Sequence, residues 1–213
     1  MHRNGGQVIF PPSQRTITLA VTGASGSLLA QQMLRALEAD ERVAHVNFVC
    51  SSSGMRVVFE ELGLGGRNQL PRLLLGTEPR KTRVQNNADV GACIASGSHP
   101  TDAMIVLPCS MATLGRIAHG VASRLIERAA DVCLKERIPL VLCVRESPLN
   151  LIHLRNMTQA AEAGATIFPV MPALYNHPAS IEEMGWNFVC RVLKHIGLPQ
   201  AGAYVWKPEP QGQ

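Results

Sequence analysis

Five short apolar runs, separated by stretches with helical periodicity, constrain the fold of this chain more than any other feature. The runs cover residues 17–21, 45–50, 103–107, 140–144 and 166–170. Each is apolar nearly throughout, which is typical of a strand buried on both faces of a parallel sheet. The intervening patterns predict helices over residues 28–39, 55–62, 111–119, 124–137, 149–163 and 180–196. This alternation predicts a three-layer α/β fold of the Rossmann type, a mainly parallel sheet with helices on both faces.

We expect one domain over residues 16–199. It lies between a flexible N-terminal lead-in, residues 1–15, and a C-terminal tail, residues 200–213. Residues 63–101 hold several glycines and prolines, which predicts loops and one or two short helices there. The last helix has clear ends, because Ser180 and Glu183 form a capping-box pattern before it and Gly197 follows it.

Composition excludes several classes of protein. Apolar residues make up 46% and charged residues 17% of the 213 residues, which excludes disorder. A net charge of +4 and only 4% aromatic residues argue against nucleic acid as a partner and favour a small anionic ligand. No 18-residue apolar stretch or signal peptide is present, so we expect a cytoplasmic protein without a membrane span. The six cysteines form no C-x-x-C pair, which favours free buried thiols and no metal site.

In such folds, ligands bind where the strands end. The first strand is followed by residues 23–27, whose small side chains let a ligand approach the backbone and whose helix N-terminus offers N–H groups to an anion; a purely structural tight turn is the alternative. Ser51 follows the second strand, and Ser110 and Thr113 follow the third. Their hydroxyls are candidates for ligand contact, but Ser51 and Ser110 are equally suited to capping the next helix.

Charged and aromatic candidates follow later in the chain. Arg128 and Lys135 are seven residues apart on one helix face, a spacing that suits a shared anion or a solvated face. Arg145 and Glu146 come directly after a buried strand, where an exposed loop pair is the alternative. Tyr175 lies in a stiff segment with three prolines between residues 169 and 178, which favours a contact role.

Six segments, taken in order, resemble the flavin prenyltransferases of the UbiX family over residues 16–199. They are Thr22-Gly23-Ala24-Ser25-Gly26, Ala95-Ser96-Gly97-Ser98, the segment from Leu107 to Leu114, the helix from Arg128 to Arg137, Val144-Arg145-Glu146-Ser147-Pro148-Leu149, and Pro172-Ala173-Leu174-Tyr175-Asn176-His177-Pro178. The resemblance implies a flavodoxin-like fold that binds FMN. It also implies transfer of a dimethylallyl group from dimethylallyl phosphate to N5 and C6 of reduced FMN, without a metal. The product, prenylated FMN, serves UbiD-type decarboxylases, and members form dodecamers with active sites between subunits.

The resemblance also implies roles for single residues. The FMN contacts are Gly23, Ala24, Ser25, Ser51, Ser110, Met111, Ala112, Thr113 and Arg145. The phosphate of the prenyl donor is held by Lys135, Arg145, Tyr175 and Arg191. The catalytic set is Ser25, Glu61, Arg128, Lys135 and Glu146, and we expect Glu146 to remove a proton through Ser25. Trp206 in the tail matches a tryptophan of some members, and we expect the tail to pack on a neighbouring subunit. Ala30 and Val90 depart from the pattern.

Two other functions remain open at this stage. The first is an FMN-dependent decarboxylase of the same fold. Enzymes of that class use a catalytic histidine and a Pro-Ala-Ser-Ala-Asn-Thr stretch. Residues 108–113 of this chain lack the asparagine of that stretch. The second is a non-catalytic FMN carrier for a partner decarboxylase, which would not need the set of Lys135, Arg145, Tyr175 and Arg191.

Overall fold

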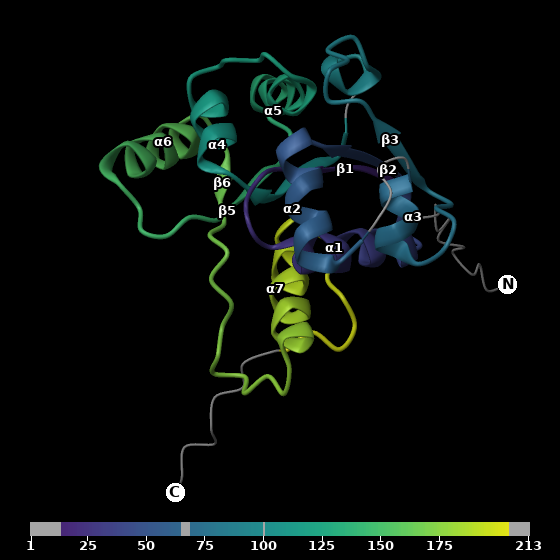
Figure 1. The fold of residues 1–213 in the computed structure, drawn as a ribbon. Coiled ribbons are helices and arrows are strands. Elements are labelled where there is room, and N and C mark those ends of the chain that lie inside the picture. The colour runs from purple at the N-terminus through teal and green to yellow at the C-terminus, as the bar shows by residue number, and fades with distance from the viewer. Residues whose placement is uncertain (1–13, 65–68, 100, 205–213) are drawn as a thin grey trace, which may run out of the picture.

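A computed structural model of the chain describes residues 14–64, 69–99 and 101–204. Most of the expected lead-in therefore lies outside the described residues, and so does the part of the tail that contains Trp206. Figure 1 traces the fold.

The centre of the molecule is a six-stranded, all-parallel sheet of order β3-β2-β1-β4-β5-β6. The strands are β1 (Arg15–Val21), β2 (Val43–Cys50), β3 (Thr82–Gln85), β4 (Ala103–Cys109), β5 (Leu140–Val144) and β6 (Thr166–Ile167). The expected α/β class and the five expected strands are confirmed. β3 was not predicted, because this edge strand has only four residues and exposes Arg83 and Val84.

β6 is shorter than predicted. It ends at Ile167, although the N–H groups of Phe168 and Val170 still donate to the carbonyls of Leu142 and Val144. Pro169 lies between them at a position whose N–H would face away from β5, so this edge of the sheet tolerates a proline. From this point the chain leaves the sheet as an extended segment, residues 168–180, which we call the arm (Figure 1).

The helices form the two outer layers (Figure 1). They are α1 (Ser27–Ala39), α2 (Ser52–Leu62), α3 (Leu70–Leu75), α4 (Met111–Ala118), α5 (Leu125–Glu136), α6 (Leu151–Glu162) and α7 (Ile181–His195), with a short 3-10 helix η2 (Cys93–Ala95). Side chains of α1, α3 and α7 share one core with one face of the sheet, while α4, α5 and α6 share a second core with the other face. Within β1, Leu19 belongs to the first core and Ala20 to the second, as expected for a strand covered on both sides.

The ends of the last helix agree with the prediction. The Ser180 hydroxyl accepts a hydrogen bond from Glu183 N, and Glu183 in turn accepts one from Ala179 N. Gly197 adopts φ 79° just beyond the helix, a backbone conformation that favours glycine. Among the described residues, no helix is both long and apolar enough to cross a membrane.

The strand order positions the site. β1 lies between β2 and β4, so the chain leaves β1 toward one side of the sheet and returns on the other. Since all strands are parallel, their carboxyl ends lie along one edge, and the loops after β1 and β4 diverge there. This divergence creates the crevice in which doubly wound folds bind ligands.

Candidate active site

The loops after β1 and β4 are joined by a hydrogen-bonded pair. Thr22 Oγ1 donates to the carbonyl of Pro108 over 2.8 Å and accepts from Ser110 N over 2.8 Å. Thr22 N also donates to Pro108 O, over 3.2 Å. Thr22 is almost completely buried, so these bonds are shielded from water and fix the two loops against each other.

Backbone contacts extend this connection to both neighbouring strands. Ser51 N donates to Val21 O over 3.0 Å, and Arg145 N donates to Cys109 O over 3.1 Å. A Cβ on Gly54 would lie 2.7 Å from Val21 O, so only glycine permits this approach of α2 to β1. We call residues 22–27, 51–54 and 108–113 the edge loops. Sequence analysis selected almost the same segments, and the structure brings them together.

Ser51 and Ser110, the two serines that follow the second and third predicted strands, both act as helix caps. Ser51 Oγ accepts from Gly54 N over 3.0 Å, and Ser110 Oγ accepts from Thr113 N over 3.4 Å. The capping interpretation is therefore correct for both, and it does not remove their hydroxyls from the edge. The same caps leave the first N–H groups of α4, on Met111 and Ala112, without intrahelical partners. These groups are suited to receive an anion.

The start of α1 differs from the prediction. The N–H groups of Gly26 and Ser27 donate to Glu61 Oε2 over 3.1 and 2.8 Å. They are not free for an external anion, because a carboxylate of the chain itself takes them. Burial raises the pKa of Glu61, but contacts with the side chains of Ser25 and Ser27 and with these N–H groups outweigh it, so its pKa lies below the ordinary value.

Glu61 thus contacts the side chain of Ser25. Glu146, which we expected to act through Ser25, accepts a hydrogen bond from Ser147 N over 2.9 Å and is exposed after β5. Arg145 is also exposed beside it.

The edge loops fit the flavin that the resemblance implies. Gly23 and Ala24 carry no side chain beyond Cβ, and a Cβ on Gly23 would meet Ser53 Oγ at 2.5 Å. This crowding, together with φ 132° at Gly26, excludes larger residues from the turn. A flat ring can therefore approach the backbone here, beside the hydroxyls of the caps.

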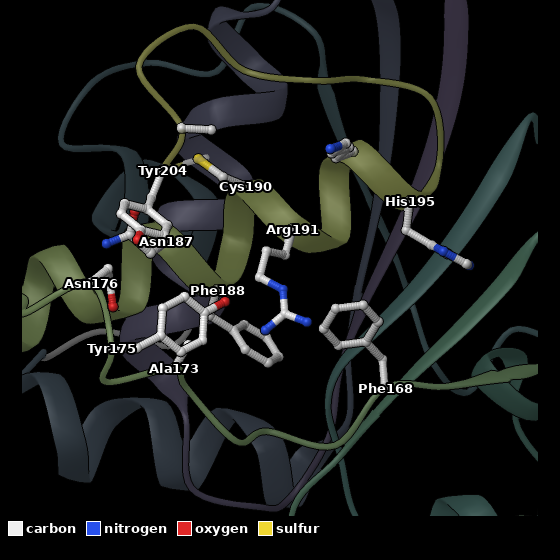
Figure 2. A pocket seen from close by; sticks show the side chains of 12 residues that line it. Phe168, Ala173, Tyr175, Asn176, Asn187, Phe188, Cys190, Arg191, His195 and Tyr204 are labelled. Atoms are coloured by element: carbon white, nitrogen blue, oxygen red, sulfur yellow. The ribbon is translucent and has the colours of Figure 1, made fainter. Parts of the chain in front are cut away.

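A second group of residues surrounds a cavity of about 570 Å³ between the arm and α7, which we call the arm cavity (Figure 2). Tyr175 of the arm and Arg191 of α7 both line it. Figure 2 shows the Arg191 guanidinium extending toward Phe168, and its Cζ lies 5.9 Å from the centre of that ring. The structure thus brings together two of the four residues expected to hold the donor phosphate.

The walls of the arm cavity are aromatic. Phe168 and Phe188 meet edge to face with ring centres 5.4 Å apart, and Tyr175 and Tyr204 lie 5.7 Å apart. The Phe168 ring attracts the cationic guanidinium of Arg191, whose N–H groups that point away from the ring can bind a ligand.

Two basic residues that sequence analysis did not select also line the arm cavity. Lys194 and His195 follow Arg191 by three and four residues, so they lie on the same side of α7. His195 Nε2 lies 3.0 Å from Thr166 Oγ1. The i+3 and i+4 spacing after Arg191 was the signal that could have identified them.

Lys135 lies near the amino ends of the strands, at the edge of the sheet opposite to the edge loops. It is in the last turn of α5, beside Gly97 and in contact with Glu136. The amino end of β5 follows only four residues after that helix. Helix α5 packs on one face of the sheet and α7, which lines the arm cavity, packs on the other, so within one chain the sheet lies between Lys135 and α7. Arg128, two turns earlier, pairs with Asp131 over 2.8 Å and donates to the carbonyl of Ala95.

Ala30, Val90 and the cysteines differ in their burial. Ala30 is fully buried in the core of α1, and Val90 is half exposed before η2. All six cysteines are free, and burial raises the pKa of Cys109 to about 12, with a further contribution from Glu127. Over the described ranges, no three His, Cys, Asp or Glu side chains gather as metal ligands would.

Comparison with known proteins identifies close relatives. The family described as Flavoprotein matches residues 11–187. Flavin prenyltransferase UbiX of Pseudomonas aeruginosa is 41% identical over 190 residues, 86% of this chain and 90% of that protein. A probable UbiX-like flavin prenyltransferase of Bacillus subtilis is 40% identical, over 89% of this chain and 88% of its own.

Solved structures agree with these sequences. A dodecameric FMN-dependent UbiX-like decarboxylase from Escherichia coli O157:H7 superposes with a TM-score of 0.81 at 38% identity, covering 91% of this chain and all of that one. AnUbiX in complex with FMN and dimethylallyl pyrophosphate gives a TM-score of 0.82 at 38% identity, over 92% of this chain and 100% of its own. The FMN-dependent cysteine decarboxylase TvaF shares the fold alone, at 18% identity and a TM-score of 0.56.

Proposed function

The chain belongs to the UbiX family of flavin prenyltransferases, and on this basis we propose that it transfers a dimethylallyl group from dimethylallyl phosphate to N5 and C6 of reduced FMN. One observation carries the proposal beyond the family. Tyr175 and Arg191, a phenol and a guanidinium suited to a departing phosphate, line one cavity in a chain whose edge loops suit a flavin.

The edge loops bind the flavin in this proposal. When bound, reduced FMN supplies the nucleophilic ring nitrogen. Gly23, Ala24 and Ser25 lie against it, and the hydroxyl of Ser51 lies beside them. A second set of contacts follows β4 and β5 and consists of Ser110, Met111, Ala112, Thr113 and Arg145.

The arm cavity and Arg145 receive the donor. As the allylic carbon–oxygen bond breaks, its electron pair leaves with the phosphate, and negative charge grows on the leaving oxygen. Arg191 and Tyr175 donate hydrogen bonds to it, and Arg145 adds a second guanidinium. In place of a metal, these fixed donors stabilise the leaving group.

Closure of the second bond at flavin C6 releases a proton. We assign its removal to Ser25 Oγ and the carboxylate of Glu61, since Glu61 contacts Ser25 and its lowered pKa keeps it ionised near neutral pH. Glu146 follows Arg145 directly, so we place it beside the donor as an additional acidic group.

Lys135 and Arg128 serve the site of a neighbouring subunit in this proposal. Both lie on α5, on the other face of the sheet from α7, so we place them at the arm cavity of another subunit across an interface. A relative at 38% identity is dodecameric, which supports such an assembly here. We expect Lys135→Ala and Arg191→Ala to be inactive alone and to regain activity when co-assembled, because some sites then keep both residues. Two inactive variants that never complement each other would place both residues in the same site.

The product, prenylated FMN, would pass to a UbiD-type decarboxylase. We also propose a cytoplasmic location, where free thiols such as those of this chain persist.

The decisive experiment incubates the purified protein anaerobically with reduced FMN and dimethylallyl phosphate and measures the mass of the flavin. A flavin that gains one five-carbon unit supports the proposal. An unchanged flavin would leave a carrier function, and carbon dioxide released from an added acid would indicate the decarboxylase. The cysteine decarboxylases share only the fold with this chain, so we expect no such release.

A further inference from the structure

A second cavity, of about 590 Å³, is lined by residues of α2, α3, β3 and the segment before α5, and we call it the β3 cavity. Cys50 and Ser52 line it, and these two residues flank Ser51 of the edge loops. The arm cavity lies beyond β6, at the other end of the strand order from β3 (Figure 1). The β3 cavity is therefore a separate space beside the edge loops, and the proposed function assigns no role to the residues that line it.

One side of the β3 cavity is apolar. It consists of side chains of Phe48, Met55, Leu70, Pro71 and Val84. Phe48 and Leu70 are buried, so this side is a fixed part of the core, whereas Val84 is 63% exposed. Cavities of about 300–1,000 Å³ with apolar walls and a few polar groups are typical of small-molecule sites, and a flat ring gains free energy by leaving water for such a wall.

The other side carries three amide side chains, and their existing hydrogen bonds show which atoms remain available. Asn86 Oδ1 and Asn87 Oδ1 each accept a backbone N–H, over 3.0 and 3.1 Å. Gln85 Nε2 donates to Asn47 Oδ1 over 3.2 Å. Among the described residues, this leaves two asparagine NH₂ groups as donors and Gln85 Oε1 as an acceptor. Adenine complements such a set, because N1 and N7 accept hydrogen bonds and the amino group between them donates.

Arg124 adds a positive charge to the β3 cavity. It forms no ion pair within the described parts of the chain. It is the N-cap residue of α5, although its side chain makes no capping hydrogen bond. A cation at this end of a helix is unfavourable, because the helix dipole is positive there. Helix stability therefore does not explain Arg124, whereas an anion bound in the cavity would offset its charge.

We propose that the β3 cavity binds an adenylate group, with the base between the apolar side and the amides and the phosphate on Arg124. The same chemistry is present in free AMP and in the adenylate half of FAD. This inference goes beyond the proposed function and does not depend on prenyl transfer.

Asn87 also has a structural role. Its backbone oxygen accepts from Leu125 N and its side-chain oxygen from Ile126 N, so it supplies the cap that Arg124 does not give to α5. The substitution Asn87→Asp keeps an oxygen for this cap and removes the NH₂ group. A role confined to the cap predicts no loss of ligand binding in this variant.

The experiment titrates AMP and uncharged adenosine into the FMN-loaded protein and measures binding by calorimetry. Arg124→Gln should weaken AMP binding roughly tenfold, the effect of one charge-assisted hydrogen bond, and leave adenosine binding unchanged. Asn87→Asp should weaken binding of both ligands without lowering the thermal midpoint. Arg83→Gln is the control, because it removes the same charge from β3 at a residue that does not line the cavity.

A second arm distinguishes the two sources of the adenylate. FMN-loaded protein is equilibrated with equal FMN and FAD, and the bound flavin is identified by mass. Preferential binding of FAD that is lost in Arg124→Gln assigns the cavity to FAD, whereas AMP bound alongside FMN assigns it to the free nucleotide.

Three results would overturn the inference. The first is that AMP does not bind beside FMN and FAD binds no more tightly than FMN. The second is AMP binding that is the same in Arg124→Gln, and the third is binding of UMP as tight as that of AMP. The prenyl-transfer assay is separate, so its failure would leave these readouts unchanged.

Discussion

The edge loops and the arm cavity, which the proposed function joins in one reaction, are built in different ways. In the edge loops, Thr22, Ser51, Ser110 and Glu61 all have their hydrogen-bond partners within the chain. In the arm cavity, Tyr175 is 58% exposed and Arg191 pairs with no carboxylate among the described residues. Folding alone therefore fixes the hydrogen bonds of the edge loops, whereas Tyr175 and Arg191 keep polar groups that a ligand or a neighbouring subunit could meet.

The largest expected effect is on turnover and comes from the arm cavity. Arg191→Ala removes a donor aimed at the leaving phosphate, so we expect turnover to fall by about 10²–10³-fold, as for the loss of one oxyanion donor. FMN affinity, measured by quenching of flavin fluorescence, should hardly change. Arg83→Ala is the matched control. A parallel loss of FMN affinity would show that the two regions do not act separately.

A substitution in the edge loops should mainly lower the free energy of unfolding. Gly54→Ala would place a Cβ 2.7 Å from the carbonyl oxygen of Val21, which cannot move without shifting β1. We expect a loss of about 1–3 kcal/mol in the free energy of unfolding, as for overpacking elsewhere, together with weaker FMN binding. Urea denaturation provides the measurement.

Gly91→Ala is the control for this substitution. Its new Cβ would meet only Asp89 Oδ1, at 3.3 Å, and that side chain can turn away. Equal destabilisation by the two substitutions would contradict a tightly constrained contact between α2 and β1.

The smallest effect concerns Glu61 and depends on pH. Its pKa is lower in the folded chain than the ordinary value of about 4.3, so folding favours the ionised form. Its contribution is complete above that value and disappears as the pH falls through the lowered pKa. Because the side chain is largely solvated, we expect Glu61→Gln to cost less than about 1 kcal/mol at pH 7.

The measurement is the thermal midpoint of both proteins between pH 7 and pH 4. The difference should shrink toward the acidic end. A gap that widens on acidification would reverse the sign and refute a carboxylate held in its ionised form by the start of α1.

Much of the fold was predictable, because continuous apolar runs identify central strands whatever their neighbours. β5 was predicted to the residue as Leu140–Val144. β3 was not, since an edge strand with exposed Arg83 and Val84 lacks that signal. β6 is shorter than predicted: regular strand geometry ends at Ile167 although Phe168 and Val170 still donate to β5, and the apolar run alone does not show where the chain leaves the sheet.

The meeting of the edge loops was predictable, because the carboxyl ends of parallel strands lie along one edge of the sheet. Ser51 and Ser110 were correctly placed at one edge, and their hydroxyls cap helices as well. The contact between Glu61 and Ser25 was not predictable, because Glu61 reaches the start of α1 only through tertiary packing of α2. Lys194 was not selected from the sequence, because a lysine in the last turn of a helix is common and only the structure shows the cavity beside it.

The hydrogen bond from Ser110 N to Thr22 Oγ1 joins residues 88 positions apart. During synthesis, a ribosome-bound chain that ends before β4 has made the glycine-rich turn and its contacts with Glu61, but not the loop after β4 that binds Thr22. Capture of the flavin is therefore a late event in biogenesis, and nascent fragments shorter than about half of the protein should emerge without it.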